Sequence, residues 1–137
     1  GVIVMAPHVF VEEVGLASIA AARDAYASGE LRAKLAKYHA HVDCAFRGWC
    51  DSWLNPDFRS WNIEAVLPGI AVPVLQIQGE GDQYGTVAQL DAIARGVRGP
   101  CQTLLLADCR HAPHLEQPQA TLDAVARFLR AAGSKTH

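Results

Sequence analysis

The hydrophobic pattern of the chain alternates between short continuous apolar runs and longer segments in which apolar residues recur every three or four positions. The continuous runs are residues 2–5, 72–78 and 103–107. Runs of this length, bounded by Gly, Pro or polar clusters, are typical of strands buried on both faces of a parallel sheet. We therefore predict three short strands.

Helical periodicity fills the intervals between these runs. Three helices are predicted between residues 11 and 55, and the third ends before Asn55-Pro56. A fourth helix starts at Thr86, which has the capping-box spacing to Gln89. A last helix starts at Pro118, and its predicted buried face consists of Leu122, Val125, Ala126 and Leu129.

The order of strand, helix, strand, helix from residue 72 onward predicts an α/β fold. Parallel strands joined by crossover helices give this order, because the helices cover sheet faces that would otherwise meet water. Three strands are few for such a sheet, and residues 2–5 would have a bare hydrophobic edge. We predict an incomplete doubly wound parallel sheet of about three strands with a helical cap inserted after the first strand.

Composition narrows the possible functions. A chain of 137 residues with 50% hydrophobic and 19% charged residues is typical of one soluble globular domain. The net charge of −2, without a Lys/Arg cluster, predicts neither nucleic-acid nor membrane binding. We expect a cytoplasmic protein, because the apolar run at the N-terminus is much shorter than the roughly 20 residues of a membrane span. The four cysteines lack Cys-x-x-Cys spacing and are interpreted as free thiols.

The candidate chemistry lies in the segments that follow the predicted strands. Ligands of open parallel sheets bind at the carboxyl ends of the strands. Asp82 follows the second run, His111 follows the third, and His8 follows the first. A carboxylate beside an imidazole fixes its tautomer and stabilises the imidazolium that forms when it accepts a proton. We predict that Asp82 and His111 are paired and that His8 lines the same cleft.

These two segments resemble the acid and histidine loops of the α/β-hydrolases. In that family a strand ending in Gly-x-x-Asp supplies the acid of a catalytic triad, and the triad histidine is followed by an acidic residue and a helix-starting Pro. The matching residues here are Gly79–Asp82, His111 and Glu116-Gln117-Pro118. The resemblance covers essentially the whole chain and implies a core strand at 1–7, a helical cap at 8–70 and the C-terminal part of the core at 71–137.

The sequence departs from the family pattern in two places. Arg110 stands where the family usually has Gly before the histidine, and no Gly-x-Ser-x-Gly nucleophile elbow occurs. The resemblance therefore implies the C-terminal portion of a serine hydrolase acting on an ester, thioester or C–C bond. This portion is expected to be inactive alone and to need no metal or organic cofactor. The rival hypothesis, which Arg110 keeps open, is a non-catalytic module of the same fold that binds a small ligand or a protein.

Several residues have competing interpretations. His114 is an alternative to His111, although the spacing to Pro118 favours His111. Glu80 could supply the acid of the pair in place of Asp82. Cysteine thiolates and imidazoles bind zinc, but the group of Cys109, His111 and His114 has no fourth ligand nearby, and we predict no metal site.

The expected binding partners follow from the cap and from the sheet edge. Trp49 and Trp53 share a predicted helix face and are candidate substrate-binding residues, with the core of the cap as the alternative interpretation. The expected substrate is a small ester-like or acyl molecule. The bare strand edge is expected to pair with a missing N-terminal half or with a second copy of the chain.

Overall fold

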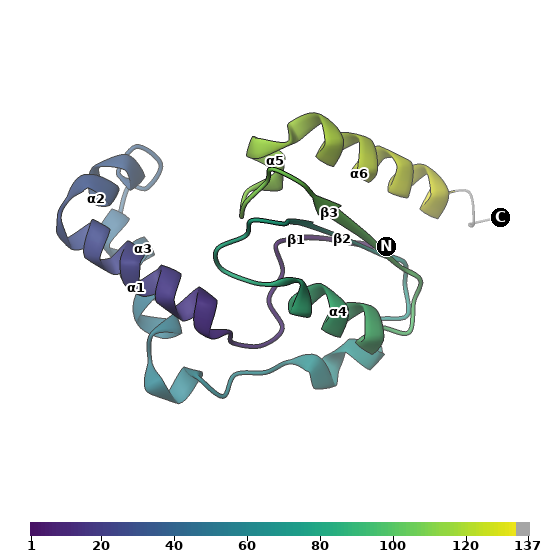
Figure 1. The fold of residues 1–137 in the computed structure, drawn as a ribbon, viewed down its shortest axis with the longest axis horizontal. Coiled ribbons are helices and arrows are strands. Elements are labelled where there is room, and N and C mark those ends of the chain that lie inside the picture. Colours follow the sequence, from purple (N-terminus) through teal and green to yellow (C-terminus); the bar gives the residue numbers. More distant parts are fainter. Residues whose placement is uncertain (134–137) are drawn as a thin grey trace. The chain divides into compact units, whose positions relative to one another are not determined.

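The computed structural model describes residues 1–133, which form two compact units (Figure 1). The sheet unit contains residues 1–10 and the described residues from 62 onward, and the helical unit contains residues 11–61. The cap was predicted to extend from residue 8 to residue 70. The units divide elsewhere because Phe10 forms an antiparallel bridge with Asn62, and the Ile63 amide donates to the Val9 carbonyl at 2.8 Å. These contacts join both ends of the predicted cap to the sheet unit.

The sheet has the three predicted strands, β1 (Val2–Met5), β2 (Val74–Gly79) and β3 (Cys101–Leu106). All pairings are parallel, and the order is β1-β2-β3. All six residues of β2 are buried, as expected for a central strand of a parallel sheet. The expectation of burial on both faces is wrong for β1 and β3, which are the outer strands of the described sheet and are partly exposed. The predicted α/β class is confirmed, and the carboxyl ends of the three strands lie at one edge of the sheet.

Helices cover the two faces of this sheet. Figure 1 shows α4 (Val87–Gly96) and α6 (Pro118–Gly133) on opposite sides of the strands. Side chains of β2 alternate between the two sides. Leu75 and Ile77 belong to a core cluster with Phe128 of α6, whereas Val74 packs in a second cluster with Ile93 of α4.

The buried face of α6 differs from the prediction. Leu122 and Leu129 are 62% and 57% exposed, and the buried residues are Thr121, Ala124 and Phe128. Of the predicted residues, Val125 does pack, partly buried, against the cluster that contains Phe128. The two sets differ by one position along the helix, which corresponds to a rotation of about 100°. Apolar residues occupy two adjacent stripes of α6, and the stripe that contains Phe128 packs on the sheet. A periodicity argument gave no reason to prefer that stripe.

The helical unit contains the three predicted helices, α1 (Glu13–Ala27), α2 (Glu30–Leu35) and α3 (Val42–Trp53). The 3-10 helix η1 (Pro56–Phe58) follows them, and a second one, η2 (Glu64–Gly69), lies in the sheet unit. Aromatic rings provide much of the interior, for example the stacked Tyr26 and Phe46, whose centroids are 3.8 Å apart. Within residues 1–133, no helix has both the length and the apolar character that a membrane span requires.

Candidate active site

The loops that follow the three strands bring the predicted residues together in the sheet unit. His111 Nδ1 lies 3.0 Å from Asp82 Oδ1 and 3.1 Å from Asp82 Oδ2. The ring centroids of His8 and His111 are 6.2 Å apart, and the two ring planes form an angle of 44°. Because the strands are parallel, all three loops lie at the same edge of the sheet. The loops of Asp82 and His111 follow adjacent strands, which brings the two side chains close enough for contact.

The carboxylate of Asp82 is enclosed and held by several donors. Its side chain is 1% exposed, and its Oδ1 accepts a hydrogen bond from the Tyr84 amide at 2.8 Å. Burial raises the pKa of Asp82, but hydrogen bonds from His111 and from the amides of Tyr84 and Gly85 outweigh it, so the pKa lies below the ordinary value. The group is therefore an anion at neutral pH.

An anionic Asp82 determines how His111 can act. The carboxylate only accepts hydrogen bonds, so the proton of the neutral imidazole lies on Nδ1 and the Nε2 lone pair remains available. The His111 side chain is 39% exposed, in contrast to its buried partner. This arrangement can take a proton from a hydroxyl at Nε2 and stabilise the resulting imidazolium.

Gly79 permits the close approach of the two loops. A Cβ atom at this position would overlap the backbone carbonyls of Cys109 and Arg110. The contact is reinforced by the Gly81 amide, which donates to the Cys109 carbonyl at 2.9 Å. The first residue of the Gly-x-x-Asp sequence therefore has a steric role in placing Asp82 beside the His111 loop.

The His111 loop is ordered by Glu116. The two carboxylate oxygens of Glu116 accept hydrogen bonds from the backbone amides of Arg110 at 2.9 Å and Ala112 at 3.0 Å, on either side of His111. Glu116 ends a one-turn helix, α5 (Pro113–Glu116), which lies before the predicted start of the last helix at Pro118. The side chain of Arg110 is exposed, and the pair between His111 and Asp82 forms in its presence.

Two residues of the site were missed by the sequence interpretation. The Tyr84 ring meets the His111 ring edge-on, with a centroid distance of 4.7 Å. Gln78 Nε2 donates to Asp82 Oδ2 at 3.2 Å. A signal for Gln78 was present in the sequence, because a polar residue within an apolar central strand needs a buried partner.

The competing residues occupy other positions. His114 lies in α5 and Glu80 follows β2, and both are exposed. Among residues 1–133, no group of three His, Cys, Asp or Glu side chains is arranged to hold a metal ion. Cys109 is buried, and burial, together with the nearby Glu116 and Asp82, raises the pKa of its thiol. The thiol is therefore protonated at neutral pH, a poor state for a nucleophile or a ligand.

Trp49 and Trp53 lie in the helical unit. Trp53 makes edge-on contacts with Phe58 and Trp61, at centroid distances of 5.3 and 5.7 Å. Trp49 is 37% exposed and meets the ring of Phe46 edge-on at 5.7 Å. These contacts favour the interpretation that both tryptophans belong to the core of the cap, and substrate binding by them stays a prediction.

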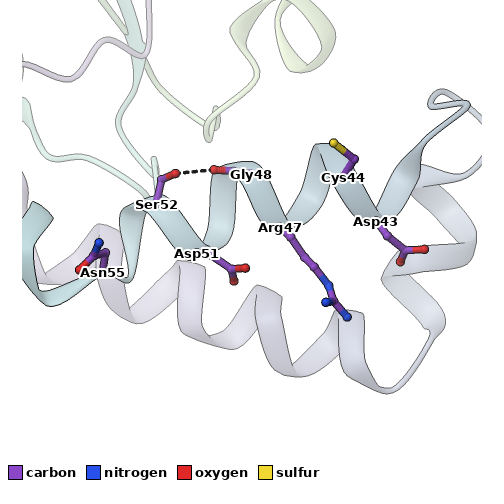
Figure 2. Close-up of a pocket in the computed structure, with 7 residues that line it drawn as sticks. All are labelled: Asp43, Cys44, Arg47, Gly48, Asp51, Ser52 and Asn55. Carbon is purple, nitrogen blue, oxygen red and sulfur yellow. Dashed lines mark hydrogen bonds between the residues drawn. The ribbon is translucent and has the colours of Figure 1, made fainter.

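A surface hollow runs along one helix of the same unit (Figure 2). The residues that line it are Asp43, Cys44, Arg47, Gly48, Asp51, Ser52 and Asn55. Ser52 Oγ donates to the Gly48 carbonyl at 2.6 Å, a hydrogen bond within the helix.

Comparison with known proteins identifies the fold through solved structures. No protein-family model and no curated protein matches the chain. An α/β-hydrolase from a Medee basin deep-sea metagenome aligns with 93% of the chain at 15% identity and a TM-score of 0.61, which covers 55% of that structure. A thermophilic esterase from Thermogutta terrifontis aligns with 95% of the chain at 17% identity, covering 55% of its own length with a TM-score of 0.58. The enol-lactonase from Burkholderia xenovorans aligns with 93% of this chain at 21% identity, covering 55% of its own length with a TM-score of 0.57. The chain thus spans about half the length of each of these three structures.

Proposed function

Because the described residues form part of the α/β-hydrolase fold, we propose that the chain is the C-terminal portion of a serine hydrolase that cleaves an ester, thioester or C–C bond. The observation that carries this proposal is the contact of His111 Nδ1 with the buried carboxylate of Asp82, at the ends of neighbouring parallel strands. This is the relation that a triad base and its orienting acid require.

In the proposed reaction, each residue has one role. A serine hydroxyl from another segment of the protein loses its proton to His111 Nε2 while its oxygen attacks the substrate carbonyl. His111 then gives this proton to the leaving group as the acyl–serine ester forms. Water, deprotonated by His111 in the same way, hydrolyses that ester, and His111 returns the proton to the serine oxygen; Asp82 stabilises the imidazolium in both halves. The proposal involves no metal or organic cofactor.

The nucleophile is assigned to another segment for reasons of sequence and chemistry. The sequence contains no Gly-x-Ser-x-Gly, the elbow that exposes the serine in this fold. Burial also raises the thiol pKa of the cysteines at positions 50, 101 and 109, which makes them poor substitutes.

The surface of the sheet unit supports a role for an additional segment. Strand β1 pairs with β2 alone in the described sheet, and Met5 at its end is 40% exposed. Leu122 and Leu129 of α6 are also largely exposed. We propose that the segment carrying the nucleophile covers these side chains and pairs with β1, and that the chain alone associates through them. Sedimentation of the chain as a monodisperse monomer would contradict this part of the proposal.

The decisive experiment compares the 137-residue chain with the complete protein that contains it, using nitrophenyl esters of increasing acyl length. We expect turnover by the complete protein only. His111→Ala should abolish this turnover, whereas His114→Ala, which removes an exposed histidine three positions away, should preserve it. Turnover by the chain alone that disappears in His111→Ala would refute the assignment of the nucleophile. A complete protein without Gly-x-Ser-x-Gly and without ester turnover would instead favour the non-catalytic module.

A further inference from the structure

Two glutamines lie in the middle of the central strand, where apolar residues are expected. Gln76 and Gln78 of β2 are 0% and 1% exposed, and they share the face of the sheet that α4 covers. Burial of a primary amide without partners costs several kcal/mol. Each amide therefore needs a specific set of acceptors, and these sets differ between the two residues.

The amide of Gln78 is oriented by two acceptors. Its Nε2 donates to the Gly85 carbonyl at 2.7 Å and to Asp82 Oδ2 at 3.2 Å. The opposite orientation of the amide would place its oxygen against two other oxygens, so the two acceptors determine which way it points. Gln78 Oε1 has no hydrogen-bond partner among the described residues. Gln76 Oε1 likewise has no partner among the described residues, so the two glutamines differ in what their Nε2 groups hold and not in their oxygens.

We propose that Gln78 is a positioning residue that fixes the carboxylate of Asp82 and thereby holds His111 in the orientation needed for proton transfer. The Tyr84 amide holds Asp82 Oδ1, and Gln78 holds Oδ2, so rotation of the carboxylate about its Cβ–Cγ bond would break one of these bonds. The Tyr84 donor lies in the loop, whereas Gln78 lies in a fully buried strand and connects the carboxylate to the rigid part of the sheet.

The second acceptor of Gln78 extends this role to the loop itself. The Gly85 carbonyl belongs to the segment between β2 and α4 that carries Asp82, so a single amide joins both the carboxylate and its loop to the strand. The inference deepens the proposed function, because it assigns a role at the same pair of residues.

Gln76 provides a matched control two positions earlier on the same strand. It is equally buried, and its Nε2 also has two acceptors, the Leu90 carbonyl at 3.0 Å and Thr103 Oγ1 at 2.7 Å. Neither acceptor is charged, and neither belongs to the His111 or Asp82 loop. Loss of Gln76 should therefore cost stability without an effect on the site.

The first test needs no substitution. In a pH titration followed by NMR, the side-chain NH₂ signals of Gln78 should shift with the same midpoint as the carboxyl carbon of Asp82, because its protonation removes the charge that they face. The NH₂ signals of Gln76 should not follow this midpoint. Gln78 signals that are indifferent to the titration of Asp82 would overturn the inference, even if no substituted protein folds.

The second test compares Gln78→Met with Gln76→Met, since Met preserves the length of the side chain and removes both donors. Gln78→Met should raise the pKa of Asp82 and, in the complete hydrolase, lower kcat about tenfold with little change in KM. Gln76→Met should leave the Asp82 pKa and kcat unchanged. Equal loss of stability in both variants, with no change in the Asp82 pKa, would show that Gln78 is merely structural. If the Gln78 NH₂ signals follow the titration of Asp82 but the complete protein has no turnover, the proposed hydrolase would be refuted, whereas the hold of Gln78 on the Asp82 carboxylate would stand.

Discussion

Asp82 in the sheet unit and Asp43 in the helical unit each accept hydrogen bonds from a basic side chain, and each has a pKa below the ordinary value for an aspartate. The pKa of Asp43 is lowered first by its hydrogen bond to Arg32, whose Nε and Nη2 lie 2.9 and 2.7 Å from its carboxylate oxygens, and then by Tyr26. Burial raises the pKa of both carboxyls, but only at Asp82 is it the largest single influence, which the donors together outweigh. The side chain of Asp43 is 52% exposed, and that of Asp82 is 1% exposed.

This difference shows which of the two carboxylates the fold is built to hold. Water screens the pair between Arg32 and Asp43, and exposed pairs of this kind contribute little to stability. Asp82 has lost its hydration, so the protein must supply donors in its place, and it does so through loop amides, His111 and Gln78. A lowered pKa thus accompanies an exposed ion pair in one unit and a buried, hydrogen-bonded carboxylate in the other.

The largest predicted effect concerns catalysis. In the proposed complete hydrolase, Asp82→Asn should lower kcat by about 10³- to 10⁴-fold, because an amide no longer stabilises the imidazolium or the required tautomer of His111. Asp43→Asn should leave kcat unchanged. Steady-state kinetics with a nitrophenyl ester provides the measurement. Similar kinetics for Asp82→Asn and Asp43→Asn would remove the functional distinction between the two carboxylates.

The next effect concerns the backbone around each carboxylate. Gly79→Ala should destabilise the fold by about 3 kcal/mol or more, because the new Cβ would overlap the carbonyls of Cys109 and Arg110. Gly48 lies within α3, and a Cβ there would have no neighbour within 4 Å. Gly48→Ala should therefore stabilise the fold by up to about 1 kcal/mol. Urea unfolding measures both changes, and a tolerated Gly79→Ala would show that the loops do not need their close contact.

Much of the sheet unit could be predicted from sequence. The continuous apolar runs gave the three parallel strands, although only β2 is buried along its whole length, and strand-end placement brought Asp82 to His111. The centre of the buried face of α6 was predicted wrongly: Val125 packs on the sheet cluster, but Leu122 and Leu129 are exposed. Two apolar stripes lie side by side, and periodicity gave no reason to prefer the one with Phe128.

Long-range polar contacts were beyond the sequence argument. Gln89 has capping-box spacing to Thr86, whose Oγ1 accepts from the Ala88 amide at 3.2 Å. The Gln89 side chain also reaches 80 residues back, where its Oε1 accepts from the Val9 amide at 2.7 Å. The partners of such an amide depend on which backbone atoms remain unpaired after folding. The same limitation concealed the contact of Gln78 with Asp82.

A smaller effect is expected in the pH dependence of stability. The pKa of Asp82 is lower in the folded protein than in the unfolded chain, where an aspartate has a pKa of about 4. Asp82 therefore stabilises the fold at pH values above about 4, and this contribution is lost as the pH falls through its folded-state pKa. Urea unfolding between about pH 5 and pH 2 should show a steeper loss of stability for the wild type than for Asp82→Asn. Identical slopes would mean that the donors around Asp82 do not favour its charged form.

The smallest effect separates the two carboxylates by their response to salt. Asp43 lies in an exposed pair, so the difference in unfolding midpoint between the wild type and Asp43→Asn should be small at low ionic strength and absent at about 1 M NaCl, where the Debye length is about 3 Å. The difference between the wild type and Asp82→Asn should persist in salt, because ions cannot enter between Asp82 and its donors. A salt-sensitive Asp82 would mean that solvent reaches the carboxylate, and the proposed enclosure by Gln78 and the loop amides would then be wrong.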